Sequence, residues 1–129
     1  MKLTDVERRL LALHYLFPVP VNRLKILYEM DPDLVNFHTY SADKLAKVLR
    51  ITVQKAIQLK ENLQKSVTTP YEKLYERYDI TPIPFTNPLY PKQLLLLIDP
   101  PTVLYTKGDS SLLSENFQVA IIGSRKATV

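Results

Sequence analysis

The stretch Phe117-Gln-Val-Ala-Ile-Ile-Gly123 decides the fold class of this chain. It is a continuous β-branched and apolar run that ends in glycine, which is typical of a strand buried on both faces of an α/β sheet. The chain ends soon afterwards, at Val129. A buried strand needs neighbours on both sides, so we expect the α/β domain to be truncated.

The residues that follow this strand have the chemistry of an anion site. Gly123 lets the backbone approach a phosphate, and consecutive amides before a helix point positive potential at it. Ser124 adds a hydroxyl donor, Arg125 adds a bidentate cation, and Lys126 is an adjacent candidate. An ordinary β-to-α turn with an exposed Arg-Lys pair explains the spacing equally well, so both interpretations stay open.

Upstream of this strand the chain is rich in proline. Six of the ten prolines lie between Pro82 and Pro101. Proline removes a donor from a ladder, so residues 80–85 can form only an edge or irregular strand. Residues 102–107 predict a second strand that ends in a turn at Gly108 and Asp109. Residues 110–114 predict a short helical turn.

Residues 1–67 predict four or five short helices. Three start signals are the capping box Thr4-Asp-Val-Glu7 and the N-caps Ser41 and Thr52, the last opening a helix from about Val53 to Val67. A fourth signal, Thr69-Pro70-Tyr71-Glu72, predicts a connecting helix that runs to Tyr78. The predicted fold class is α + α/β, with a helical domain over residues 1–69 and a second, truncated domain over residues 70–129.

Composition excludes several kinds of chemistry. The 129 residues contain no cysteine, so disulfides, thiol nucleophiles and cysteine metal sites are absent, which fits a reducing compartment. Two glycines are too few for dinucleotide or Walker loops. His14 and His38 are predicted to be surface or packing residues, and Asp99 to brace a turn. We therefore predict no metal site, no cofactor and no catalytic residue.

The net charge of +4 lies in residues 1–70, which hold eleven basic and seven acidic residues. A basic strip could meet nucleic acid, but the helices also carry acids, so a solvated face is favoured. The residues concerned are Arg8, Arg9, Lys44, Lys47, Arg50 and Lys55. No signal peptide is visible, and the longest apolar run, residues 94–98, is too short for a membrane span. We expect a cytoplasmic protein.

Tyr71, Tyr75 and Tyr78 fall on one face of the predicted connecting helix. A row of tyrosines could stack unpaired bases. We favour the alternative, an aromatic seam that packs this helix on the sheet with Leu74 beside it.

Two motifs together resemble one family. The first is Tyr90-Pro91 followed by leucines and then Asp99-Pro-Pro-x-x-Leu-Tyr-x-x-Gly108, and the second is the apolar strand that ends in Gly123-Ser-Arg125. Their order and spacing resemble the bacterial DNA-processing protein DprA (Smf) family from about Tyr90 to Thr128. The N-terminal helices resemble, more loosely, the sterile-alpha-motif-like (SAM-like) or helix-hairpin-helix-like domain of many members.

This resemblance implies a non-enzymatic mediator of recombination in natural transformation and competence. It implies a Rossmann-like domain that binds single-stranded DNA without sequence preference, protects it, helps load RecA recombinase and forms a homodimer. The Gly-Ser-Arg loop of the family contacts DNA phosphate, a role that falls here on Gly123, Ser124 and Arg125.

Two departures leave alternatives open. Most of the Rossmann-like domain and any C-terminal winged-helix-like domain are missing. The helical connection Leu49-Arg-Ile-Thr52 lacks a hairpin glycine, which favours a protein-interaction or spacer role for these helices over DNA binding. A nucleotide-phosphate enzyme resembling phosphoribohydrolases, or a pure protein-interaction module, are the alternative functions.

Overall fold

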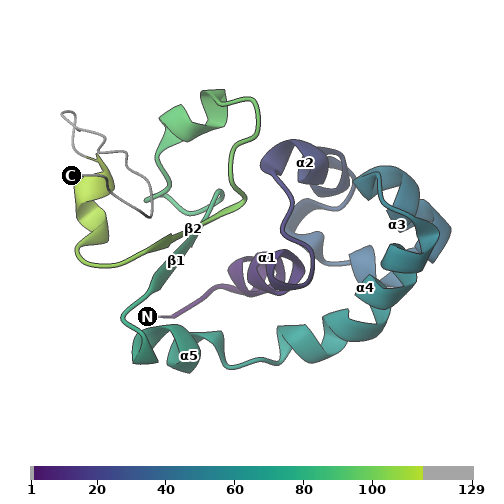
Figure 1. Ribbon diagram of the computed structural model, residues 1–129, viewed down its shortest axis with the longest axis horizontal. Coiled ribbons are helices and arrows are strands. Elements are labelled where there is room, and N and C mark those ends of the chain that lie inside the picture. The colour runs from purple at the N-terminus through teal and green to yellow at the C-terminus, as the bar shows by residue number, and fades with distance from the viewer. Residues whose placement is uncertain (1, 115–129) are drawn as a thin grey trace, which may run out of the picture.

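The computed structural model describes residues 2–114, which form a mostly helical body with one small sheet (Figure 1). The helices are α1 (Asp5–Leu16), α2 (Val21–Met30), α3 (Ala42–Leu49), α4 (Val53–Val67) and α5 (Tyr71–Arg77). The strands are β1 (Thr81–Pro84) and β2 (Val103–Thr106). Short 3-10 helices occupy Pro32–Leu34, Phe37–Thr39, Lys92–Leu96 and Ser110–Ser114. The helical and sheet parts agree in outline with the predicted fold class.

Three predicted helix starts are confirmed. The Thr4 hydroxyl accepts the Glu7 amide at 3.2 Å, and the Glu7 carboxylate accepts the Thr4 amide at 3.1 Å, which completes the capping box of α1. Ser41 caps α3 and Thr52 caps α4, each through its hydroxyl. These caps satisfy amides that have no partner inside the helix.

The prediction for the fourth helix start was wrong in its details. Pro70, and not Thr69, precedes α5, and no side chain caps this helix. Glu72 does not close a capping box, because its carboxylate instead binds the guanidinium of Arg8. The partner lies 64 residues away in sequence, beyond the reach of a local pattern. The helix also ends at Arg77, one residue earlier than predicted.

Helix α3 ends in a left-handed residue that is not glycine. Arg50 has φ 57° and ψ 48°, and the Ile51 amide donates to the Ala46 carbonyl at 3.0 Å. This conformation usually falls to glycine because a Cβ crowds the backbone there. It allows α3 to turn directly into α4, so the absence of a glycine does not prevent a tight helical hairpin.

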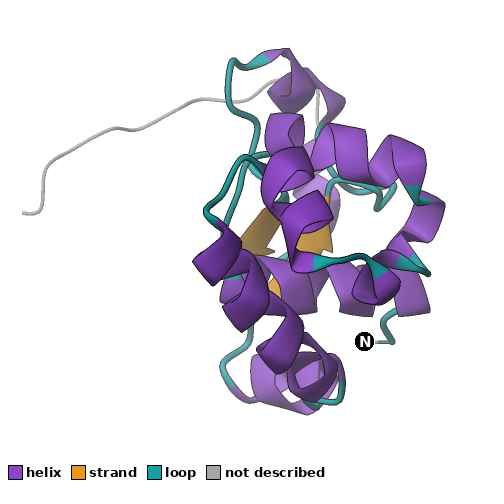
Figure 2. Cartoon of the chain, turned by 90° about the vertical axis from the view of Figure 1, so that its right-hand side faces the viewer, coloured by secondary structure: helices purple, strands orange, loops and turns teal. Residues whose placement is uncertain are grey.

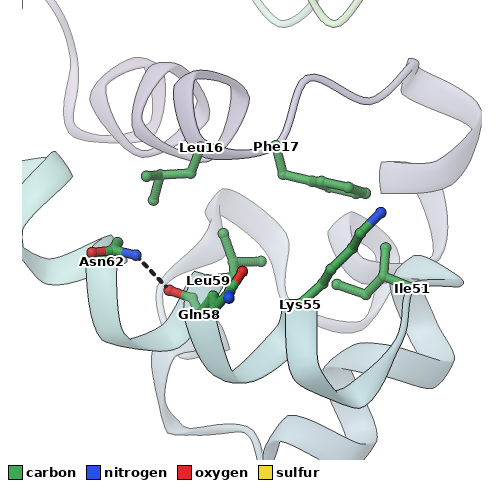
Figure 3. A pocket seen from close by; sticks show the side chains of 7 residues that line it. All are labelled: Leu16, Phe17, Ile51, Lys55, Gln58, Leu59 and Asn62. Carbon is green, nitrogen blue, oxygen red and sulfur yellow. Dashed lines mark hydrogen bonds between the residues drawn. The ribbon is translucent and has the colours of Figure 1, made fainter.

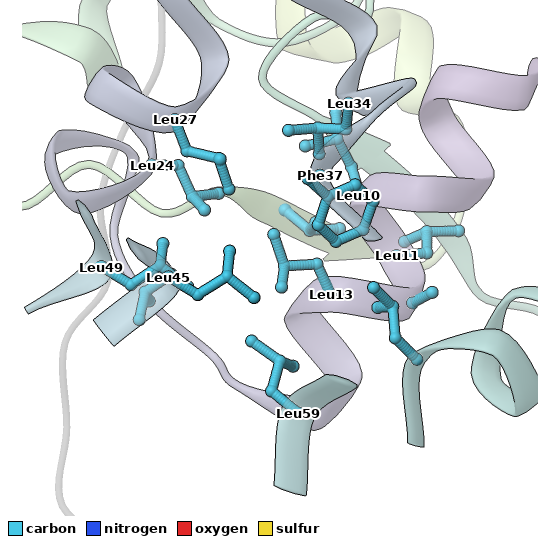
Figure 4. Packing of buried hydrophobic residues seen from close by; sticks show 14 of the residues in the cluster. Leu10, Leu11, Leu13, Leu24, Leu27, Leu34, Phe37, Leu45, Leu49 and Leu59 are labelled. Carbon is cyan, nitrogen blue, oxygen red and sulfur yellow. The ribbon is translucent and has the colours of Figure 1, made fainter. Parts of the chain in front are cut away.

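The core gathers mainly around α1, which lies between α4 and the two strands (Figure 1). Leucines from four helices meet there, as Figure 4 shows, and all of them are buried: Leu10, Leu11, Leu13, Leu24, Leu27, Leu45, Leu49 and Leu59. The cluster also includes Tyr71 of α5 and Val103 of β2. The two predicted domains therefore share apolar contacts across residue 69.

The sheet is a two-stranded antiparallel ribbon that pairs Thr81 with Thr106 and Pro84 with Val103. Strands β1 and β2 confirm the strands predicted within residues 80–85 and 102–107, and the prolines of β1 fit an edge position. From the side shown in Figure 2, the ribbon lies behind the helices. Gly108 follows β2 with φ 90°, which agrees with the predicted glycine turn. Within residues 2–114, no helix is both long and apolar enough to cross a bilayer.

Candidate nucleic-acid interface

The predicted phosphate loop, Gly123, Ser124, Arg125 and Lys126, lies outside the described residues. The predicted strand over residues 117–122 lies outside them as well. Both stay predictions. The structure does describe the segment that precedes them, from β1 to Ser114, and the helical surfaces beside it.

The Asp99-Pro-Pro-Thr102 motif binds the corner between α1 and α2. The Val21 amide donates to the Pro100 carbonyl at 2.9 Å, and the Thr102 hydroxyl donates to the Val19 carbonyl. Tyr90 closes the motif from the other side, because its hydroxyl donates to the Pro101 carbonyl at 2.6 Å. A braced turn was predicted here from the prolines. The structure adds that two of these three hydrogen bonds join the turn to the α1–α2 corner.

Neighbouring residues of α1 make two further links to distant segments. The buried Glu7 carboxylate accepts a hydrogen bond from the Asn87 amide at 2.8 Å. The Arg8 guanidinium donates to the Thr69 carbonyl at 3.0 Å and pairs with Glu72. The hydrogen bond from Arg8 lowers the pKa of the Glu72 carboxyl.

These links divide the six candidate residues of the basic strip. Arg8 is engaged by Glu72, and Arg9 donates to the Asp33 carbonyl at 3.1 Å. The other four lie on the hairpin formed by α3 and α4, and all four are exposed: Lys44, Lys47, Arg50 and Lys55. We call them the hairpin cations. The sequence pattern did not separate them from the rest, because charge summed over residues 1–70 hides differences between helices.

The aromatic seam extends beyond the connecting helix. Tyr71 and Tyr75 stack with ring centroids 6.1 Å apart, and Tyr75 meets Tyr105 of β2 at 5.6 Å. Tyr71 is 1% exposed and its hydroxyl lies 2.7 Å from that of Ser66. Burial raises the pKa of Tyr75 and of Tyr105. These rings pack the protein, as the favoured interpretation predicted.

Tyr78 and Leu74 do not belong to this seam. They are 57% and 42% exposed, so the predicted seam covers only part of the helix face. The seam instead continues to His14, whose Nδ1 lies 3.0 Å from the Tyr105 hydroxyl. Burial lowers the pKa of His14 because it penalises the imidazolium. His14 is thus a packing residue, in agreement with the prediction.

A cavity of about 250 Å³ opens between the end of α1 and the start of α4 (Figure 3). Leu16 and Phe17 face Lys55 and Leu59 across it, with Gln58 and Asn62 at its polar side. One cation and two amides over an apolar floor can hold an anion or a planar polar group. None of the described residues that line the cavity is acidic, so they offer no carboxylate for acid–base chemistry.

The described residues contain no group of three histidine, aspartate or glutamate side chains that could hold a metal ion. Asp109, in the turn after β2, accepts the Ser111 amide at 3.0 Å and the Ser111 hydroxyl at 2.6 Å. These hydrogen bonds lower the pKa of the Asp109 carboxyl. Asp109 therefore braces the turn after β2. A similar bracing role was predicted for Asp99 in the turn before β2.

Comparison with known proteins relates the C-terminal part of the chain to a family of recombination mediators. Residues 81–129, which begin at β1, match the family DNA recombination-mediator protein A, and this match agrees with the resemblance that the sequence motifs indicated. Among curated proteins it is similar to "DNA processing protein DprA" of Bacillus subtilis (strain 168), with 41% identity over 54 residues. This match covers 42% of the chain and 18% of the relative. No solved structure matches.

Proposed function

We propose that this chain takes part in DNA processing and recombination by binding single-stranded DNA without sequence preference. The observation that carries the proposal is the family match over residues 81–129, which includes the Gly123-Ser-Arg125 loop. The loop has the residue types that a phosphate site needs. The position of Gly-Ser-Arg inside the matched segment supports its assignment as the phosphate site.

The mechanism is electrostatic and involves no bond making or breaking. Gly123 admits the backbone to close approach, Ser124 donates a hydroxyl hydrogen bond, and Arg125 grips phosphate oxygens with its planar fork. Lys126 adds a further positive charge. Contacts of this kind hold the strand and leave the bases unread, so affinity varies little with sequence and strongly with salt.

The described contacts support this mechanism because they fix the matched segment to the helices by hydrogen bonds. The Asp99–Thr102 motif is bound to the α1–α2 corner, and the segment after β1 is tied to Glu7 through Asn87. A site that must hold a flexible polymer benefits from a rigid scaffold, because less ordering cost accompanies binding.

The larger role in this proposal is that of a cytoplasmic protein of natural transformation. It includes protection of the strand, RecA loading and homodimerisation. A SAM-like helical domain and a Rossmann-like domain would supply its architecture. The resemblance of the two sequence motifs supports this role, and the family match supports its link to recombination.

The test replaces Arg125 with alanine in the protein that carries this sequence. We expect weaker binding of every single-stranded sequence tried, and a salt slope lower by about 0.7, the value for one phosphate fewer neutralised. Fluorescence anisotropy with labelled oligothymidine and mixed-sequence strands measures both quantities. Arg23→Ala, which removes an exposed cation of α2, is the matched control. Equal affinities and slopes for the two variants would exclude Arg125 as a phosphate ligand.

A further inference from the structure

The α3–α4 hairpin carries the entire net charge of the protein. Residues 41–67 hold six basic side chains and two acidic ones, a net charge of +4. The rest of the chain holds eleven basic and eleven acidic residues, a net charge of zero. Such segregation is not required for folding, because the same helices could be solvated by balanced charges.

The hairpin cations are exposed, and few acids lie near them in the chain. Within residues 2–114, the close ion pair between Arg8 and Glu72 joins other helices. The two acids of the hairpin are Asp43, in the first turn of α3, and Glu61, in the second half of α4. Lys44 lies over the Tyr40 ring, 4.2 Å from its centroid, which leaves its charge in place.

Three of the hairpin cations are evenly spaced in the sequence. Lys44, Lys47 and Arg50 follow one another at intervals of three residues along α3 and into the turn that ends it. A helix rises about 1.5 Å per residue, so Lys44 and Lys47 lie about one turn apart on the same side. A series of cations fits a linear polyanion better than a compact anion, because each strand of duplex DNA carries one phosphate for about every 3.4 Å of helix axis.

The start of α4 adds to the positive potential at the end of this series. Helix α4 has 15 residues and no acidic residue in its first turn. The first turn of α4 therefore adds no carboxylate that would oppose the helix dipole, although Asp43 of α3 lines the same hollow as Thr52 and Val53. Arg50 and Lys55 flank this end on either side of Thr52, and the left-handed Arg50 brings the end of α3 next to it.

We propose that the α3–α4 hairpin is a second DNA-contacting surface, which binds the phosphodiester backbone through Lys44, Lys47, Arg50 and Lys55. This inference rests on the proposed function and extends it from the matched segment to the helices. The hairpin lengthens the path over which a strand is held. The missing hairpin glycine favoured a protein-interaction or spacer role for these helices in the sequence. The structure forms the tight turn without that glycine, through the left-handed Arg50.

The test compares two double variants of the protein that carries this sequence, and each variant removes two exposed cations. Lys47→Gln/Arg50→Gln changes the hairpin, and Arg23→Gln/Lys25→Gln changes α2. With labelled oligothymidine, the hairpin variant should lower the salt slope by up to about 1.4, which is about 0.7 for each of two phosphates. The α2 variant should lower it by less than half as much. Circular dichroism checks that both variants are folded.

Four outcomes would overturn the inference, and one of them would also overturn the proposed function. Equal slopes for the two double variants would show that only net charge matters. A hairpin effect on binding to phosphatidylserine vesicles but not to oligothymidine would make the partner a membrane surface. Failure of the unchanged protein to bind oligothymidine would overturn the proposed function as well. Weaker binding by Arg125→Ala together with an unaffected hairpin variant would overturn this inference alone.

Discussion

His14 shows how one side chain can make stability depend on pH. Its ring lies against Tyr105, with Nδ1 3.0 Å from the tyrosine hydroxyl, and burial lowers its pKa from 6.5. The folded protein therefore binds a proton at His14 less readily than the unfolded chain does. Stability from this residue is present above about pH 6.5 and is lost as the pH falls toward the lower, folded-state pKa.

We expect the unchanged protein to lose stability between neutral and mildly acidic pH more steeply than His14→Gln does. Glutamine keeps a polar partner for Tyr105 but does not titrate in this range. Urea unfolding at a series of pH values measures the difference, and His38→Gln, at an exposed histidine, serves as the control. Parallel curves for the protein and His14→Gln would contradict the role assigned to burial.

Local signals at single residues were predictable, and long-range partners were not. Thr4, Ser41 and Thr52 indicate helix starts because a cap bonds an amide only a few residues away. Glu72 carries the same kind of signal, but Arg8 takes its carboxylate across the fold. The local pattern at Glu72 does not reveal whether its carboxylate binds a nearby backbone amide in a capping box or the guanidinium of Arg8.

The turn of the α3–α4 hairpin has a backbone conformation that its sequence does not predict. Leu49-Arg-Ile-Thr52 contains no glycine, yet Arg50 adopts the left-handed conformation that ends α3. This conformation costs an L-residue about 1–2 kcal/mol, whereas glycine tolerates it. Packing of Leu49 and Ala56 in the core fixes the turn from both sides, so tertiary contacts outweigh the local preference.

We expect Arg50→Gly to raise the free energy of unfolding by about 0.5–1 kcal/mol, after the extra chain entropy of glycine is subtracted. Arg50→Ala is the matched control, because it removes the same guanidinium and keeps the strained backbone. Thermal or urea unfolding of the two variants makes the comparison. A gain of the same size for alanine would show that charge, and not backbone strain, is responsible.

At the scale of the whole molecule, one apolar core contains residues from both sides of the predicted domain boundary at residue 69. Tyr71 is buried, stacks on Tyr75 and shares a hydroxyl contact with Ser66 of α4. Val103 of β2 belongs to the same apolar cluster as the leucines of α1. The predicted domains of residues 1–69 and 70–129 remain a sequence-based division, but their described parts pack together.

We expect Tyr71→Ala to lower the free energy of unfolding by about 3–5 kcal/mol, the range for deleting a buried aromatic side chain. Tyr78→Ala removes the same atoms next to the same helix at a residue that is 57% exposed, and should change stability by about 0.5 kcal/mol or less. Urea unfolding of both variants tests the contrast. Similar changes in stability would mean that the seam adds little to the core.

Most helices and both strands could be predicted because their patterns are local. Capping residues, apolar spacing and the position of prolines and glycine fix where elements begin and end. The arrangement of surface charge became evident only once α3 and α4 were seen to form one hairpin. The phosphate loop, Gly123–Lys126, stays a prediction from residue chemistry and from the matched segment.

The hydrogen bond from Thr102 to Val19 spans 83 residues, and this separation matters during synthesis. A ribosome adds roughly 5–20 residues per second, so the partner of the α1–α2 corner is made roughly 4–17 s after the corner itself. Until then the corner offers an unpaired carbonyl at Val19 and an incomplete surface around it. The N-terminal helices can collapse early, but the nascent chain completes its native contacts only late.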